Sequence, residues 1–318
     1  MNGKQPESCR LCPRACGALR EEGQTGACGA GKEIRIARAA LHFWEEPCIS
    51  GKEGSGAVFF SGCPLKCRFC QNQEISRGKA GASVSIERLS QIFLELQEQK
   101  ANNINLVTAG HYLPQVREAL LLAKKRGLRV PVVYNTGSYE KPEAIRSLEG
   151  LVDIYLPDLK YLDPGLAEAY SGAGDYPECA KAAIREMVRQ APRPEFDSRG
   201  MLKRGVIVRH LLLPGHVKEG KKIVRYLWET YGSRIYLSLM NQYTPTKAVE
   251  RDPLLGRKVT KREYERLLDY ALKLGVEQGF FQEGETAEES FIPPFDLEGV
   301  RTARTFRGTA DSTRPSEP

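Results

Sequence analysis

The feature that most constrains this 318-residue chain is a group of three closely spaced cysteines. Cys63, Cys67 and Cys70 form the pattern C-x3-C-x2-C. Three thiolates at this spacing can ligate three corners of a cubic iron–sulfur cluster and leave the fourth iron open, whereas electron-transfer clusters ordinarily have four cysteine ligands. A substrate or cofactor can bind at an open metal position. The alternative interpretation is a zinc knuckle or three structural thiols.

The composition limits the class of protein. With 41% hydrophobic residues, the chain can form a substantial core as one large domain or two small ones. No apolar run approaches the ~20 residues that span a bilayer, and the first residues contain no apolar stretch, so we expect a cytoplasmic protein. In a reducing compartment, nine cysteines favour metal binding over disulfides. The net charge of +7 comes from basic residues interleaved with acidic ones, so no nucleic-acid partner is expected.

Short apolar segments alternate with helical patterns through the middle of the chain. They are rich in β-branched and aromatic residues, which is typical of buried parallel strands. The six predicted strands are 57–61, 104–108, 130–134, 152–156, 206–213 and 235–239. Helix starts are predicted at Ser85, Pro142 and Thr260, from an N-cap, a first-turn proline and a capping box. Strands that alternate with helices predict an α/β fold, either a βα-repeat barrel or an open sheet.

The pattern divides the chain into three predicted parts. Residues 1–56 are rich in glycine and cysteine, residues 57–284 contain the strand–helix alternation, and residues 285–318 form a C-terminal extension. The extension is predicted to be disordered from about residue 301, because it is polar and lacks periodicity.

A second group of cysteines lies near the N-terminus. It consists of Cys9, Cys12, Cys16 and Cys28, spaced C-x2-C-x3-C-x11-C among glycines. Four thiolates on glycine-rich turns can ligate a tetrahedral zinc ion, a rubredoxin-like iron or a second iron–sulfur cluster, and the sequence does not distinguish these. Cys48 and Cys179 are interpreted as lying outside both sites, although Cys48 precedes the first strand and could approach either one.

Polar residues follow several predicted strands, at the strand ends where parallel βα folds bind their ligands. Asn135 lies at the end of the third strand. Asp158 and Lys160 follow the fourth strand and point to the same side, so they can pair and hold a ligand, or form a structural ion pair. Arg209 and His210 are adjacent in the fifth strand, so they face opposite ways.

Together these features resemble the radical SAM superfamily, and within it the relatives of pyruvate formate-lyase activating enzyme that carry an extra N-terminal cysteine cluster. The resemblance extends from about residue 9 to about residue 300. The matching stretches are 45–51, 62–72, 134–136, 153–161, 209–211 and 240–245.

This resemblance implies a partial (β/α)6 barrel of the TIM type. It implies that Cys63, Cys67 and Cys70 ligate a [4Fe–4S] cluster, and that S-adenosylmethionine (SAM) binds the open iron and is split to a 5′-deoxyadenosyl radical. The expected SAM contacts are Phe69, Asn135, Asp158, Lys160 and His210. No catalytic residue is assigned.

The chain departs from the family pattern after the second strand. Most radical SAM enzymes have Gly-Gly-Glu there, whereas this chain has Ala109, Gly110 and His111. The subgroup commonly has a histidine at this point, so SAM binding is still expected, without the detailed contacts. His111 is either an acid–base residue or a local hydrogen-bonding residue.

The resemblance also implies partners. They are a glycyl-radical enzyme as substrate and a one-electron reductant such as flavodoxin or ferredoxin. Two other functions stay open at this point. One is radical chemistry on a small molecule or a different protein residue, and the other is a non-catalytic zinc or iron–sulfur module.

Overall fold

The strands predicted from the sequence form the middle of one mostly parallel sheet. The computed structural model describes residues 8–281 and 292–301. Within them the six strands lie side by side in chain order, and each neighbouring pair is parallel. They are β2 (Ser55–Phe60), β4 (Ile104–Val107), β5 (Val132–Thr136), β6 (Ile154–Pro157), β8 (Leu202–Leu211) and β9 (Tyr236–Met240). The predicted α/β class is therefore confirmed.

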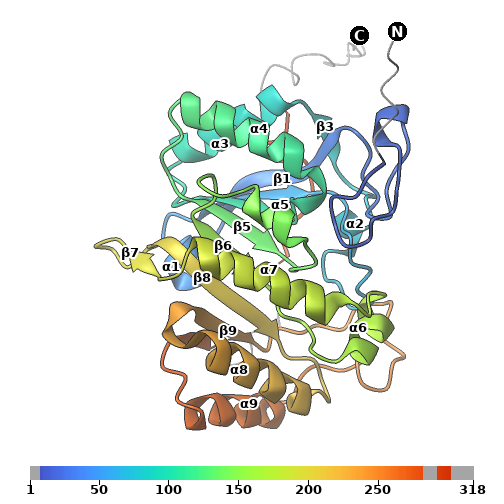
Figure 1. Ribbon diagram of the computed structural model, residues 1–318, viewed down its shortest axis with the longest axis vertical. Coiled ribbons are helices and arrows are strands. Elements are labelled where there is room, and N and C mark those ends of the chain that lie inside the picture. The colour runs from blue at the N-terminus through green and yellow to red at the C-terminus, as the bar shows by residue number, and fades with distance from the viewer. Residues whose placement is uncertain (1–7, 282–291, 302–318) are drawn as a thin grey trace, which may run out of the picture.

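Helices cover one face of this sheet (Figure 1). The longer ones are α3 (Ile86–Glu98), α4 (Leu113–Lys125), α7 (Tyr176–Gln190), α8 (Val217–Tyr231) and α9 (Lys261–Lys273), and α5 (Pro142–Arg146) and α6 (Pro164–Ser171) are shorter. The predicted starts are confirmed: Ser85 accepts a hydrogen bond from the Arg88 amide, Pro142 opens α5, and Thr260 forms a capping box before α9.

The opposite face of the sheet encloses the interior of a partial barrel. Strand residues alternate between two cores, so Val133 faces the interior and the next residue, Tyr134, packs under the helices. A short helix, α1 (Pro47–Ser50), packs its Ile49 against Val133 and Ile154 in the interior. This helix fills one end of the barrel and leaves space at the other end, where the parallel strands finish.

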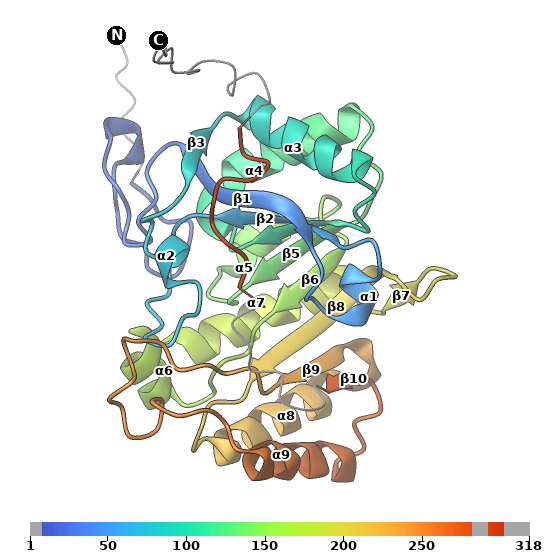
Figure 2. The same cartoon turned by 180° about the vertical axis from the view of Figure 1, so that it is seen from behind.

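Antiparallel strands extend the sheet beyond β2 (Figure 2). β1 (Ile34–His42) pairs with β2, and β3 (Ala82–Val84) pairs with β1. At the other edge β10 (Gly279–Phe281) pairs with β9, and β7 (Glu195–Phe196) forms a hairpin with β8. The sequence did not predict these four strands. Because β1 belongs to the sheet, the predicted boundary between residues 56 and 57 falls inside a continuous unit.

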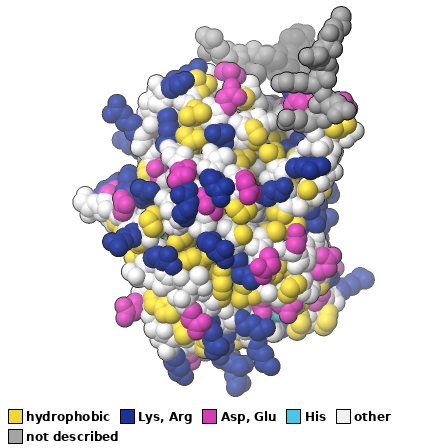
Figure 3. All heavy atoms as spheres, viewed as in Figure 1, with side chains coloured by type: hydrophobic (Ala, Val, Ile, Leu, Met, Phe, Trp, Pro, Cys, Tyr) yellow, Lys and Arg dark blue, Asp and Glu magenta, His cyan; other side chains and the backbone are white. Residues whose placement is uncertain are grey.

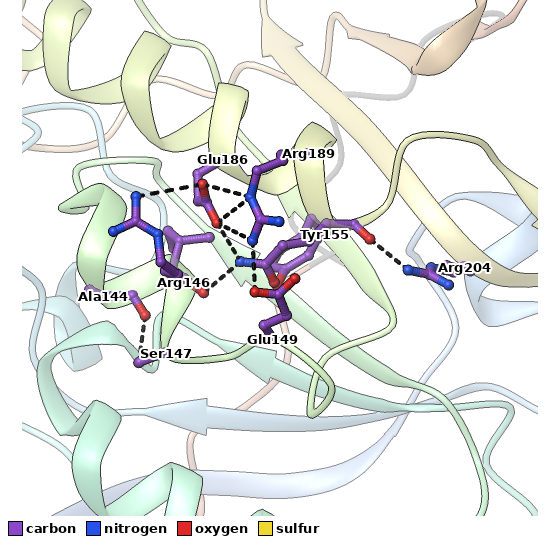
Figure 4. Close-up of polar contacts among 10 residues, drawn as sticks. Ala144, Arg146, Ser147, Glu149, Tyr155, Glu186, Arg189 and Arg204 are labelled. Carbon is purple, nitrogen blue, oxygen red and sulfur yellow. Dashed lines mark hydrogen bonds and ion pairs between the residues drawn. The ribbon is translucent and has the colours of Figure 1, made fainter.

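A polar network on the helix side fixes α7 against β6 and α5 (Figure 4). Glu186 of α7 accepts hydrogen bonds from Arg189 and Gln190, and the Gln190 amide also donates to the Ile145 carbonyl. The Tyr155 hydroxyl of β6 donates to the Gln190 side chain at 2.5 Å. Each buried polar group here has a partner, so the network locates α7 without leaving unsatisfied groups.

The surface shows no single basic face in the view of Figure 3, where Lys and Arg side chains are interleaved with Asp and Glu. Among the described residues, no helix combines the length and the apolar character needed to cross a membrane. The predicted disorder from about residue 301 lies almost entirely outside the described residues.

Candidate active site

The three cysteines of the C-x3-C-x2-C pattern lie on the loop after β2 and line one cavity of about 280 Å³ at the ends of the parallel strands. The cavity brings together most of the residues that the sequence selected. Its walls include Phe69, Asn135, Asp158 and Lys160, and also Arg209. These residues come from four different strand ends or loops, which is the arrangement expected of a site in a parallel βα fold.

The backbone of the cysteine loop is fixed by neighbours on two sides. The Cys63 amide donates to the Cys28 carbonyl at 3.0 Å, and the Lys66 amide donates to the Ser171 carbonyl at 3.2 Å. The Ser171 hydroxyl donates to the Cys67 sulfur at 3.0 Å. The loop therefore has a defined shape although it contains no regular secondary structure over most of its length.

The chemistry of the thiols fits a metal cluster. Burial raises the pKa of Cys63 and of Cys67 above the ordinary thiol value, because a thiolate at the cavity wall is poorly solvated. A metal removes this penalty, since it takes the sulfur as a thiolate and supplies the compensating positive charge. The three side chains border one cavity, and among the described residues they are not grouped around a single metal-ion position. This suits a cubane, in which each thiolate binds a different iron.

Across the cavity, Lys160 and Asp158 form an ion pair with 2.5 Å between Nζ and Oδ2. Burial opposes the charge on Lys160, but the Asp158 carboxylate holds the lysine pKa well above its ordinary value. Both side chains remain partly exposed and both border the cavity. The predicted geometry, with the two side chains on one side of the chain, is what the structure shows.

Phe69 and Asn135 also border the cavity. The Phe69 ring is buried between Tyr170 and Tyr243, with ring centroids 6.5 and 6.0 Å away. The Asn135 amide donates to Glu45 at 3.3 Å. Phe69 therefore borders the cavity, as expected of a SAM contact, and also makes the ring contacts of a core aromatic residue.

Arg209 lies on the interior side of β8 and forms a buried cluster with two acidic residues. Its guanidinium donates to Glu46 at 2.8 Å and makes a second ion pair with Glu45. Burial opposes ionisation of Glu46, but Arg209 holds the Glu46 pKa below its ordinary value. Glu45 and Glu46 were selected from the sequence only as part of a matching stretch. The acidic pair gives no signal of this contact, because 163 residues separate Arg209 from Glu46.

His210, the next residue, faces away from the cavity. It is buried under α8, where its Nδ1 lies 2.9 Å from the Leu159 carbonyl and its Nε2 approaches Gly220. Burial lowers the His210 pKa to about 4. The structure therefore does not bring His210 to the predicted SAM contacts, and Arg209 occupies the interior position of the pair.

His111 is also buried, in the short turn after β4. Its Nε2 lies 2.8 Å from the Ser61 carbonyl, and burial lowers its pKa to about 4. This contact supports the start of the cysteine loop, next to Gly62, whose φ of +97° favours glycine. His111 does not border the cavity, so its surroundings are those of a local hydrogen-bonding residue.

The N-terminal cysteines lie next to the cysteine loop. The Arg20 guanidinium donates to the Cys28 sulfur at 3.3 Å, and the sulfurs of Cys16 and Cys28 lie on the same side of Gly26. Burial raises the Cys12 pKa to about 11. In the described ranges, no three Cys, His, Asp or Glu side chains are grouped as ligands of one metal ion. A metal at the four N-terminal cysteines therefore stays a prediction.

Comparison with known proteins decides the family. The sequence pattern of the Radical SAM superfamily matches residues 57–227, which is more than half of the chain and includes the cysteine loop, Asn135, the Asp158–Lys160 pair and Arg209. The chain belongs to the radical SAM superfamily. Enzymes of this superfamily use a [4Fe–4S] cluster and SAM, and the cavity described above contains the three thiols that such a cluster requires.

The relatives of this radical SAM protein differ from it considerably in sequence. An uncharacterized protein, MJ0674, of Methanocaldococcus jannaschii (strain ATCC 43067 / DSM 2661 / JAL-1 / JCM 10045 / NBRC 100440) is 26% identical over 279 residues, which are 85% of this chain and 76% of the relative. Among solved structures, a domain of pyruvate-formate lyase-activating enzyme from Bacteroides vulgatus ATCC 8482 is 14% identical. It has a TM-score of 0.40, with 54% of this chain and 92% of that chain covered.

Other radical SAM structures are similarly distant. Streptococcus suis SuiB bound to S-adenosylmethionine is 14% identical, with a TM-score of 0.47 and coverage of 70% of this chain and 48% of SuiB. The FeFe-hydrogenase maturase HydG from Carboxydothermus hydrogenoformans is 13% identical, with a TM-score of 0.49 and coverage of 76% and 59%.

Proposed function

We propose that this protein binds SAM in the cavity beside Cys63, Cys67 and Cys70 and uses it to abstract a hydrogen atom from a substrate. The observation that carries the proposal is the single cavity shared by three cluster-forming thiols and the Asp158–Lys160 pair. When bound, the [4Fe–4S] cluster supplies one electron from an external reductant, which breaks the C5′–sulfur bond of SAM and releases methionine and a 5′-deoxyadenosyl radical.

The residues of the chain bind and orient SAM. Asp158 offers carboxylate oxygens to the hydroxyl or ammonium groups of SAM, and Lys160 places a positive charge for the SAM carboxylate. The neighbouring Arg209 is paired with both Glu45 and Glu46, so its guanidinium is held in the interior of the barrel and is not available as a second positive charge for the SAM carboxylate. Phe69 offers an apolar surface for the adenine.

The direct test removes the cluster ligands. Changing Cys63, Cys67 and Cys70 together to Ala should abolish the [4Fe–4S] cluster and all formation of 5′-deoxyadenosine from SAM under dithionite reduction. Cys179→Ala is the matched control, because Cys179 lies on α7 away from the cavity and should leave both unchanged. Formation of 5′-deoxyadenosine at the parent rate by the triple variant would refute the assignment.

As the substrate we propose a protein, and specifically the glycine of a glycyl-radical enzyme, as for the activating enzymes that the chain resembles. Two aromatic side chains support a macromolecular substrate. Trp44 borders the cavity and is 55% exposed, and the preceding Phe43 is 50% exposed. Exposed aromatic residues beside a site are typical of surfaces that receive another protein.

The substrate proposal has its own test. A glycyl-radical enzyme with deuterium at its glycine α-carbon should transfer deuterium into 5′-deoxyadenosine when it is mixed with the reduced protein and SAM. If SAM is cleaved and no deuterium is transferred, the radical chemistry stands and the substrate is a different protein residue or a small molecule.

A further inference from the structure

A segment near the C-terminus, outside the part of the chain that matches the family, lies along β1. We call residues 292–301 the strap. The Ala39 amide donates to the Glu298 carbonyl at 2.8 Å, and the Leu297 amide donates to the Ala37 carbonyl at 3.0 Å. Figure 2 shows the strap in red, crossing the end of the sheet that contains β1 and β2. The strap is thus hydrogen-bonded to the sheet although the two segments lie near opposite ends of the chain.

The side chains of the strap alternate between partly buried positions against the sheet and positions in solvent. Phe295 and Leu297 are half-buried, and the Phe295 ring meets the Phe59 ring of β2 edge to face at 5.7 Å. Asp296 and Glu298 point outward, where both form ion pairs with Arg38 of β1. The strap therefore has an apolar side against the sheet and a charged side in solvent, with Leu297 at a φ of +67° and a turn over residues 298–300.

A second arginine holds the far end of the strap. The Arg88 guanidinium of α3 donates to the Val300 carbonyl at 3.1 Å and to the Gly299 carbonyl at 3.0 Å. Val300 is buried in the main core. Gly299 has a φ of +69°, and a Cβ at this position would overlap the Ala39 carbonyl oxygen, so close contact with β1 requires glycine.

The near end of the strap reaches the candidate active site. Ile292 and Pro293 border the same cavity as Cys63, Cys70 and Asp158. The contacts that hold the strap on β1 and α3 therefore also set the position of an apolar part of the cavity wall. A fixed wall excludes water from a cavity in which a reactive radical would form, and contributes apolar contact to the bound molecule.

We infer that the strap is a structural wall of the SAM cavity, that Ile292 and Pro293 contact the bound SAM, and that Arg38 and Gly299 are positioning residues for this contact. The inference rests on the proposed binding of SAM. It assigns ligand contacts to a segment that lies well beyond residue 227, where the family match ends.

The test separates docking of the strap from binding of SAM. Docking is measured by hydrogen exchange of the Ala39 amide, and binding by equilibrium dialysis of SAM against anaerobically reconstituted full-length protein. Gly299→Ala should speed exchange at Ala39 by at least about tenfold. It should also weaken SAM binding by roughly five- to tenfold, the loss expected for one apolar contact.

Gly275→Ala is the matched control. Gly275 has a φ of +86°, and a Cβ added there would have no atom within 4 Å, so alanine has the same backbone strain without a clash. It should change neither measurement. Ile292→Ala should weaken SAM binding to a similar extent while exchange at Ala39 stays at the parent rate.

Several results would overturn the inference. Faster exchange with unchanged SAM affinity in Gly299→Ala would show that the strap is not part of the site. Unchanged SAM affinity in Ile292→Ala would show that Ile292 does not contact SAM. Unchanged exchange of the Ala39 amide in both Gly299→Ala and the double variant Arg38→Ala/Gly299→Ala would show that these residues do not hold the strap on β1. A failure of the proposed function would instead appear in the parent, as an absence of SAM binding.

Discussion

The backbone amide of Cys63, the first cysteine of the cluster loop, donates a 3.0 Å hydrogen bond to the carbonyl oxygen of Cys28, the last of the N-terminal cysteines. Arg14 adds a second link, because its guanidinium donates to the Pro64 carbonyl at 2.9 Å and lies over the Tyr139 ring. The N-terminal cysteine segment and the cluster loop are therefore one structural unit, so a change in either should be transmitted to the other.

The first prediction concerns a metal at the N-terminal cysteines. If these residues hold zinc, the parent should contain one zinc per chain, and Cys12→Ala should lose it together with part of the stability of the cluster loop. If they hold a second [4Fe–4S] cluster, the parent should contain about eight irons per chain. Metal analysis of both proteins decides between the two. One four-iron cluster and no further metal in the parent would contradict both.

The second prediction concerns the ion pair at the cavity. Asp158→Asn and Lys160→Met should each weaken SAM binding by about tenfold or more, because each removes a charged contact and leaves its partner uncompensated. The iron content should stay at the parent level, since neither residue is a metal ligand. Lys181→Met is the control, because Lys181 makes an equally short 2.5 Å ion pair with Glu178 on the surface of α7. Parent-like SAM affinity in both cavity variants would make the pair purely structural.

The third prediction concerns His210, which lies under α8 instead of in the cavity. His210→Asn should lower the free energy of unfolding by about 1–3 kcal/mol, because a buried hydrogen bond and buried ring contacts are lost. SAM affinity should stay within about twofold of the parent, well below the 1.4 kcal/mol that a tenfold change represents. Denaturant unfolding and equilibrium dialysis measure the two quantities. A large loss of SAM affinity in a folded variant would return His210 to the site.

The pKa of His210 makes the stability difference between the parent and this variant depend on pH. Burial lowers the pKa of His210 in the folded protein to about 4. Below the ordinary histidine pKa of about 6.5, the unfolded chain therefore binds more protons than the folded protein does. The stability that neutral, buried His210 gives the parent therefore decreases as the pH falls through this range. The variant lacks this contribution at every pH. The stability difference between the two proteins should shrink between pH 7 and pH 5.

The fourth prediction concerns Glu140, a buried carboxyl group beside the turn after β4. It accepts hydrogen bonds from Tyr134 and Thr136 and has no ion pair among the described residues, and burial raises its pKa to about 7. The folded protein therefore holds the proton more tightly than the unfolded chain, so stability should fall as the pH rises from about 4.5 to about 7.

Glu140→Gln removes this titration and keeps an acceptor oxygen. Above pH 7 the variant should be more stable than the parent, by up to roughly 3 kcal/mol, and the difference should disappear near pH 4.5. Urea unfolding at the two pH values measures it. If the variant is destabilised equally at both pH values, ionisation of Glu140 does not lower the stability of the folded protein.

Sequence patterns predicted the parts of the fold that depend on continuous burial. The central strands are buried on both faces, so their apolar runs are visible in the sequence. β1 was missed because Arg35 and Arg38 interrupt it, and those side chains are accommodated by partners that lie far away in the chain, such as Asp296. The alternation of strand residues required Arg209 and His210 to face opposite ways. It could not decide which one faces inward, because both are buried in the folded protein.

The candidate site likewise contains residues that local sequence patterns predicted and residues that they missed. The cysteine loop and the Asp158–Lys160 pair are local patterns, and the structure places them around one cavity. The acidic partners of Arg209 and the strap residues depend on contacts between distant parts of the chain, which spacing alone does not encode.

The strap also has a consequence for the order of events during synthesis. Arg38 and Asp296 are 258 residues apart, so their contact forms only after every described strand of the sheet has been synthesised. By then the cysteine loop and the strands around it have long been available to fold. A newly made chain therefore passes through a stage in which the cysteine loop can fold while the strap does not yet cover the β1 side of the cavity, so we expect the three thiols to be more accessible at this stage than in the finished protein.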